Sequence, residues 1–216
     1  MINPANILLP TAYFPPVSYF AHMIRSSKAY IEQMETYPKQ TYRNRCEIMT
    51  SAGKHSLVIP VTRPDGNHTI TRDIEICHRE RWQQNHWKSI QTAYSSSPYF
   101  NYYADIIQPL FDLKETSLIA HNQKILLVIC KIAGIKPSLA ITKDYVKKPG
   151  ELIDLRLEIS PKKKQSGMSF PEYPQVFSHK YGFIQNLSIL DLMFNLGPET
   201  SDYLGRIAKK SADSDC

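Results

Sequence analysis

Apolar positions in the first part of the chain follow the pattern of a strand, a helix and a second strand. The run NILLP at 6–10 is apolar and closes at a proline, which is typical of a short buried strand. From Val17 apolar residues recur every three or four positions, which predicts a helix at about 17–25. KAYIEQ at 28–33 has the pattern of another strand. This order predicts a βαβ unit and therefore a parallel sheet.

Three further segments have strand patterns. RCEIMTSAGKHSLVIPV at 45–61 predicts two strands joined by a turn at 51–54. Apolar and polar residues alternate in TITRDIEI at 69–76, which predicts a half-exposed strand. SLAITKDY at 138–145 predicts one more strand, which follows a helix.

Helical periodicity dominates the rest of the chain. The clearest stripe begins after Thr116 or Ser117, either of which can cap it, and ends before Gly134. In the last helix Ser188 and Asp191 have the spacing of a capping box. The helices that should cover the sheet lie at about 17–25, 79–94, 116–133 and 187–196. The expected fold is a single α/β domain over 1–207, with a mostly parallel or mixed sheet flanked by helices and a disordered tail at 208–216.

Composition narrows the classes of partner. The 216 residues are 42% hydrophobic, which is enough for a substantial core. A net charge of +6 and an isoelectric point of about 9.0 favour an anionic partner. The charge is moderate for a duplex binder and no helix-turn-helix, ribbon or finger signature accompanies it, so we expect no nucleic acid partner.

The cysteines and the apolar runs bear on cofactors and location. Cys46, Cys77, Cys130 and Cys216 form no C-x-x-C pair, so we expect no disulfide framework, no metal site and no cofactor. A reduced, cytoplasmic compartment fits this usage. The first residues lack the basic region and unbroken apolar run of a signal peptide, and the longest apolar run, at 125–130, is too short to span a bilayer. The oligomeric state stays open.

The most cationic short block is KQTYRNR at 39–45. If it is extended, Lys39, Thr41, Arg43 and Arg45 point to one side, opposite Asn44 and its neighbours. Three cations on one face repel unless an anion or acidic partners lie between them, and the guanidinium fork suits phosphate. Lys39, Arg43, Asn44 and Arg45 are therefore candidate substrate-binding residues. The alternative is a solvated edge strand that its cations protect from aggregation.

His22 is the candidate catalytic residue. It lies on the first predicted helix, one turn after Tyr19. If the start of that helix faces the carboxyl edge of the sheet, where open α/β folds bind ligands, His22 can serve as a general base. Tyr13 and Tyr19 are candidate substrate-binding residues of the same region. The alternative is a histidine satisfied at a packing boundary.

Two polar positions interrupt later segments. Asn122 falls on the apolar stripe of the helix at 116–133, so it needs partners inside the protein, and with His121 it either lines a pocket or pins a loop. Asp154 and Arg156 share a face if DLR is extended. That segment is either a loop over a pocket or a solvated run of charges.

Four long runs resemble one protein family. They are PTAYFPPVSYFAHMIRSSKAYIEQMETYPKQTYRNRC, SLVIPV, DLRLEISPKK and KYGFIQNLSILDLMFNLGP. Together they resemble the WbqC-like family of bacteria over nearly the whole chain. One departure is Gln185, where many members have proline.

The resemblance implies a role in O-antigen or other surface-polysaccharide synthesis and includes a glycine-transferase role. It brings no catalytic assignment. The first hypothesis is therefore a transferase that moves an aminoacyl group onto a nucleotide-linked or lipid-diphosphate-linked sugar. The second is a non-catalytic binding or assembly protein that recognises the same anionic intermediates.

Overall fold

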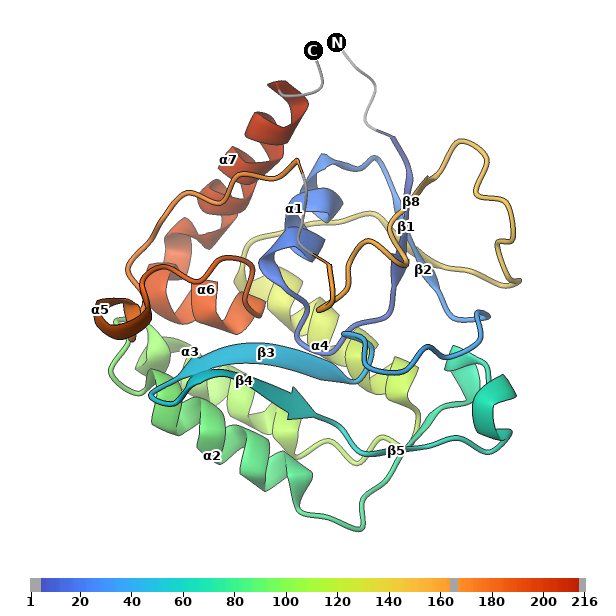
Figure 1. Cartoon of the computed structure of the whole chain (residues 1–216), viewed down its shortest axis with the longest axis horizontal. Coiled ribbons are helices and arrows are strands. Elements are labelled where there is room, and N and C mark those ends of the chain that lie inside the picture. Colours follow the sequence, from blue (N-terminus) through green and yellow to red (C-terminus); the bar gives the residue numbers. More distant parts are fainter. Residues whose placement is uncertain (1–4, 164–166, 214–216) are drawn as a thin grey trace.

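The computed structural model describes residues 5–163 and 167–213. Its centre is a four-stranded sheet, and helices flank this sheet (Figure 1). No helix in the described ranges is long and apolar enough to cross a bilayer.

The sheet is parallel throughout. Its strands are β1 (Ile7–Pro10), β2 (Ala29–Glu32), β7 (Leu139–Ile141) and β8 (Ile153–Asp154), in the order β7-β2-β1-β8. Ile7 pairs with Ala29 on one side and with Ile153 on the other. β1 is buried along its whole length, which explains its unbroken apolar run. The predicted parallel βαβ unit and the α/β fold are confirmed.

The order of the strands defines a switch point beside β1. The chain lays β2 and then β7 on one side of β1, and only later places β8 on the other side. Strand order therefore reverses between β1 and β8. In open α/β sheets the crevice at the carboxyl ends of two such strands is where ligands bind.

The predicted helices are confirmed to within three residues at each end. They are α1 (Val17–Arg25), α2 (Trp82–Tyr94), α4 (Leu118–Ile132) and α6 (Ile189–Leu196). The chain adds α3 (Phe100–Ile107), α5 (Ser178–Tyr181) and α7 (Thr200–Asp213), with short 3-10 turns at Gly66–His68, Thr71–Asp73, Gln108–Phe111 and Gly197–Glu199. The helix α7 packs against α1. It continues to Asp213, into the segment 208–216 for which we expect disorder, and residues 214–216 lie outside the described residues.

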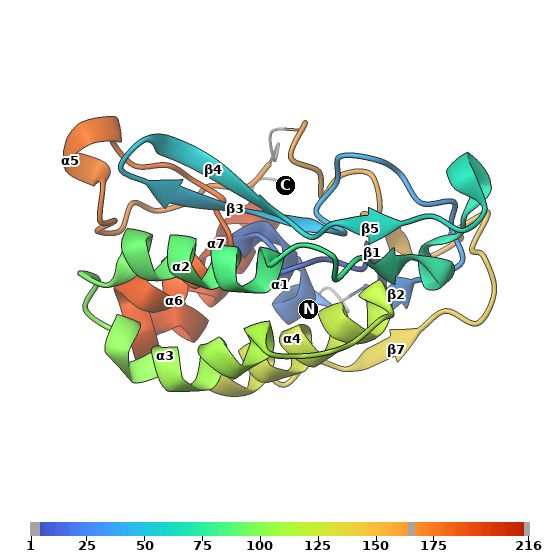
Figure 2. The same cartoon turned by 90° about the horizontal axis from the view of Figure 1, so that it is seen from below.

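A separate hairpin lies over α2. β3 (Arg45–Thr50) and β4 (Gly53–Val58) are antiparallel, and the turn between them falls where the sequence predicts it. Figure 2 shows the hairpin above α2, with α3 and α4 on the far side of that helix. Gly53 has φ 108° at the turn, a conformation that favours glycine.

The predicted strand at 69–76 is wrong. Residues Thr71–Asp73 form a 3-10 turn, and only β6 (Glu75–Ile76) is extended, paired with β5 (Val61–Thr62). The reason is hydrogen bonding to the segment after β2. The backbone N–H of Thr71 donates to the carbonyl of Glu35, and that of Arg72 to Gln33, so these donors are not available to a neighbouring strand.

The start of α6 is capped, but not by a capping box. Ser188 accepts a hydrogen bond from the N–H of Leu190 and donates to the carbonyl of Phe14. Asp191 turns instead toward Tyr173, whose hydroxyl donates to it at 2.6 Å. The predicted partner of Ser188 therefore belongs to a different, buried network.

Candidate functional site

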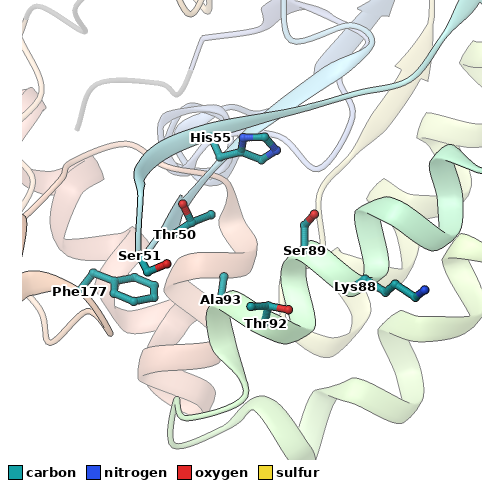
Figure 3. Close-up of a pocket in the computed structure, with 8 residues that line it drawn as sticks. All are labelled: Thr50, Ser51, His55, Lys88, Ser89, Thr92, Ala93 and Phe177. Carbon is teal, nitrogen blue, oxygen red and sulfur yellow. The ribbon is translucent and has the colours of Figure 1, made fainter.

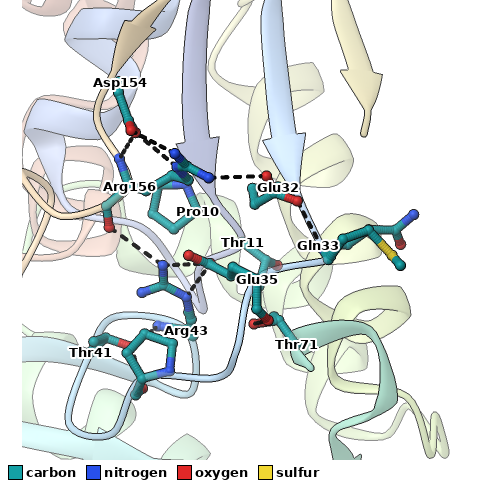
Figure 4. Close-up of polar contacts among 12 residues, drawn as sticks. Pro10, Thr11, Glu32, Gln33, Glu35, Thr41, Arg43, Thr71, Asp154 and Arg156 are labelled. Atoms are coloured by element: carbon teal, nitrogen blue, oxygen red, sulfur yellow. Dashed lines mark hydrogen bonds and ion pairs between the residues drawn. The ribbon is translucent and has the colours of Figure 1, made fainter. Parts of the chain in front are cut away.

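Charged side chains gather at the carboxyl edge of the parallel sheet (Figure 4). Arg156, two residues beyond the end of β8, bridges the carboxylates that end β2 and β8. Its Nη2 and Nε donate to Asp154 at 2.7 and 2.9 Å, and its Nη1 donates to Glu32 at 3.2 Å. The trio spans the carboxyl ends of β2, β1 and β8, and therefore includes the switch point.

The two carboxylates of this trio differ in their access to solvent. Glu32 is fully buried and accepts four hydrogen bonds, from the backbone of Met34 and Val146, from the Thr142 hydroxyl and from Arg156. Asp154 keeps 34% of its side chain exposed. Hydrogen bonds from Arg156 lower the pKa of Asp154, so it is ionised at neutral pH. Asp154 is thus the member of the trio that can meet a ligand.

A second ion pair lies next to the trio. Arg43 is 1% exposed, and its guanidinium donates twice to Glu35, at 2.6 and 2.8 Å. It also donates to the backbone carbonyl of Arg156 at 3.4 Å, which connects the pair to the trio. Burial raises the pKa of Glu35, while the charge of Arg43 acts in the opposite direction.

The predicted cationic face of KQTYRNR does not form. Residues 39–44 are in bends and turns, Gln40 has φ 59°, and the strand begins only at Arg45. Lys39 is exposed, Arg43 is buried against Glu35, and the Asn44 amide donates to the carbonyl of Ile59 at 2.8 Å. The alternation expected for an extended block is therefore wrong, because the turn separates these side chains.

Arg45 differs from the other interior arginines. It is partly buried, and its side chain has no hydrogen bond or ion pair with any residue in the described ranges. The side chain of Arg63, after β5, is likewise unpaired within the described chain. Both lie near Tyr37: burial raises the pKa of Tyr37 to about 12, and the charges of Arg43, Arg63 and Arg45 oppose that rise.

A cluster of aromatic and histidine side chains surrounds Tyr13, which lies in the loop after β1. The Tyr13 hydroxyl and Nδ1 of His86 are joined by a hydrogen bond of 3.0 Å. The His121 ring stacks on Tyr13 with 6.0 Å between centroids, and Trp82 meets both histidines edge-on at 5.2 and 5.7 Å. Phe14, next to Tyr13, has φ 37°, a strained backbone of the kind that collects at functional sites.

The histidines of this cluster are neutral. Burial lowers the pKa of His86 and of His121 to about 4 in each case. His121 is 1% exposed, and neither of its ring nitrogens has a hydrogen-bond partner in the described chain. The indole N–H of Trp82 is also buried without a partner there. Buried polar groups normally have partners, so these unpaired nitrogens could form hydrogen bonds with a ligand.

Asn122 joins the cluster to the charged edge. Its amide nitrogen donates to the carbonyl of Arg43 at 2.8 Å and to the Thr11 hydroxyl at 3.1 Å. Thr11 directly follows β1, so this amide pins two segments at the switch point. Its Oδ1 is buried with no partner in the described residues.

The start of α1 is closed, and His22 is remote from it. The N–H of Val17 donates to the carbonyl of Leu187, and that of Ser18 to Asn186 Oδ1, so these donors are not free for an anion. His22 lies in the last turn of α1, and burial lowers its pKa to about 4. Tyr19 is buried and donates to the carbonyl of Pro10 at 3.1 Å.

Neither a buried cysteine nucleophile nor a metal centre is favoured by the described residues. Burial raises the pKa of the Cys130 thiol to about 12 and raises that of Cys46 as well, so neither is a ready thiolate nucleophile. No group of three or more metal-ligating side chains could hold a metal ion in the part of the chain that the structure describes.

The structure therefore brings together Tyr13, His121, Asn122 and Arg43, and leaves His22 and Lys39 apart. Sequence reasoning missed Glu32, Glu35, Trp82 and His86. Glu32 could have been found, because an acidic residue directly after an apolar strand marks the carboxyl edge of a parallel sheet. The histidine cluster had no such signal, since its members are far apart in sequence.

Comparison with known proteins assigns the chain to a family. A model of the WbqC-like protein family matches residues 11–171 and 162–203. The chain belongs to the WbqC-like protein family. The matched ranges include every residue of the charged edge and of the histidine cluster. These candidate residues thus lie within the part of the chain that the family model matches.

Similarity to individual proteins is more distant. Uncharacterized protein Rv1507c of Mycobacterium tuberculosis (strain ATCC 25618 / H37Rv) is 28% identical over 225 residues, covering 91% of this chain and 96% of its own. No solved structure matches the chain.

Proposed function

We propose that this WbqC-like protein is a transferase of O-antigen or related surface-polysaccharide synthesis. It moves a small group, such as a glycyl group, onto a sugar carried by a nucleotide or a lipid diphosphate. The observation that carries the proposal is the partly exposed Asp154, held by Arg156 at the switch point between β1 and β8.

Asp154 is suited to sugar hydroxyls. A carboxylate at the end of a strand in a doubly wound sheet accepts hydrogen bonds from ribose hydroxyls in dinucleotide-binding folds. Here Arg156 fixes the carboxylate through three hydrogen bonds, two from its guanidinium and one from its backbone N–H, so the oxygens are oriented before a ligand arrives. A ribose or a hexose is the ligand that this arrangement favours.

The diphosphate would need cations that are not already paired. Arg43 and Arg156 are each bound to carboxylates, so they are poor candidates. Arg45 and Arg63 are unpaired within the described chain, and Lys39 is exposed nearby in sequence. A guanidinium fork binds phosphate oxygens through charge-assisted hydrogen bonds. In the block 39–45, Arg45 is the arginine that we propose for this role, and Lys39 is the other unpaired cation within the described chain.

The transfer step would need a base for the attacking hydroxyl or amine. His86 and His121 are neutral at pH 7, because their pKa values are lowered to about 4. The unpartnered nitrogens of His121 carry the lone pair that such a base needs, but the lowered pKa makes this imidazole a weak base at pH 7.

A binding titration with a nucleotide sugar tests the proposal. Asp154→Asn should weaken binding about tenfold, because a charge-assisted hydrogen bond is lost. Asp105→Asn is the matched control, since Asp105 is an exposed carboxylate on α3. Equal affinity in wild type and Asp154→Asn would show that the nucleotide sugar does not bind at the charged edge.

The second candidate is a non-catalytic binding protein of the same pathway. The observation in its favour is that both buried thiols are unreactive and the histidine cluster is enclosed. A transfer assay with labelled glycine and a nucleotide or lipid-linked sugar separates the two functions. Saturable sugar binding without transfer would support the binding protein and overturn the transferase.

A further inference from the structure

An open cavity with both polar and apolar lining lies away from the charged edge, between the hairpin β3–β4 and α2 (Figure 3). Its volume is about 450 Å³. Ser51 and His55 line it from the hairpin, Thr92 lines it from α2 with Lys88 at the rim, and Phe177 closes one end. This volume is within the range of small-molecule sites, about 300–1,000 Å³.

Four of the polar groups that line the cavity are free to bind, whereas the hydroxyls of Thr50 and Ser89 donate to backbone carbonyls. The hydroxyls of Ser51 and Thr92, the His55 ring and the Lys88 ammonium make no hydrogen bond or ion pair with any residue in the described ranges. This contrasts with Arg43 and Arg156, whose guanidinium groups are committed to carboxylates. The lining contains no acidic side chain among the described residues, so the cavity presents donors and a positive charge.

The hairpin side of the cavity is held in place. Both the Lys180 ammonium and the Tyr181 hydroxyl donate to the backbone carbonyl of Ser51 at 2.9 Å. The Thr50 hydroxyl donates to the carbonyl of Gly53 at 2.9 Å, which fixes the turn from within. The shape of the cavity therefore exists before a ligand binds, which reduces the entropy cost of binding.

We propose that this cavity binds a sugar ring that carries a carboxylate or phosphate group. Hydroxyl side chains match the hydroxyls of a sugar, and an aromatic ring such as Phe177 packs against its C–H face. Lys88 and the absence of lining carboxylates select an acidic substituent over a cationic one. The site is separate from Asp154 and Arg156, and the proposal stands whether or not the protein is a transferase.

Titrations with three simple ligands test the proposal: glucuronate, glucose 1-phosphate and glucose. Lys88→Gln should weaken binding of the two acidic sugars about tenfold and leave glucose binding unchanged, because only the acidic ligands use the ammonium. Lys114→Gln, on an exposed lysine outside the cavity, is the matched control and should bind like wild type.

Thr92→Val gives a second, independent readout. It removes a hydroxyl from an exposed helix position and should weaken all three sugars, with an unchanged circular dichroism spectrum. The proposal is overturned if wild type shows no saturable binding of any of the three ligands, or if both variants bind glucuronate like wild type. Asp154→Asn should leave these titrations unchanged, so failure here is distinct from failure at the charged edge.

Discussion

Arg43 was predicted to bind substrate, but in the structure it forms a buried ion pair with Glu35. Their ion pair is buried, with side-chain exposures of 1% and 10%. The sequence could not reveal the pair, because the turn at 36–44 that brings the two residues together has no regular period. Removing one partner of a buried pair leaves the other charge uncompensated.

We therefore expect Arg43→Ala to destabilise the protein by about 3–5 kcal/mol, the usual cost of breaking a buried pair. Urea unfolding measures this change directly. Lys39→Ala is the control and should leave the unfolding midpoint unchanged, since Lys39 is exposed and unpaired within the described chain. An unchanged midpoint for Arg43→Ala would show that the pair contributes nothing to the fold.

The buried histidines give a prediction about pH. The pKa of His121 is lowered from 6.5 to about 4, so the unfolded chain binds a proton that the folded chain excludes. Stability from this group is present above pH 6.5 and is lost as pH falls toward 4, by about 1.4 kcal/mol per unit of pKa difference. His86 acts in the same direction, whereas the raised pKa values of Glu35 and Asp191 act in the opposite one.

Replacing His121 isolates its contribution to the pH dependence of stability. The loss of unfolding free energy between pH 7 and pH 5 should be smaller in His121→Phe than in wild type, because the variant cannot bind the proton. His179→Gln, at an exposed position, is the control and should follow wild type. Parallel pH profiles for His121→Phe and wild type would show that His121 is not buried in its neutral form.

At the scale of elements, periodic segments were predictable and irregular ones were not. The β1–α1–β2 unit and the four helices follow directly from apolar spacing, because burial of one face dictates the pattern. The segment 69–76 alternates like a strand, yet its backbone donors bond to residues after β2. Tertiary contacts thus overrode the local pattern.

The junction between α6 and α7 offers a matched pair of glycine substitutions. Gly197 has φ 54°, and a Cβ there would lie 2.4 Å from the ring of Tyr99. Gly197→Ala should therefore lower the melting temperature, by overpacking that costs about 1–3 kcal/mol. Gly205 lies within α7 with nothing within 4 Å of a Cβ, so Gly205→Ala should raise stability by about 0.5–1 kcal/mol. Equal melting temperatures for the two variants would contradict this packing.

At the scale of the whole molecule, the fold gathers candidate binding residues in two separate places. The parallel sheet ends in a charged edge at its switch point, and the hairpin β3–β4 forms an open cavity with α2. The sequence predicted the sheet and so implied where a ligand site should lie. Glu32 could be expected at that edge, but its meeting with Arg156 could not be predicted, because the two residues come from distant segments.

The location of a bound nucleotide sugar tests the central claim most directly. A crystal structure of the protein soaked with such a ligand should show a ribose or sugar hydroxyl donating to Asp154, and diphosphate oxygens on Arg45 or Arg63. A ligand bound only elsewhere, with Asp154 contacting nothing but Arg156, would contradict the assignment of the charged edge as the substrate site.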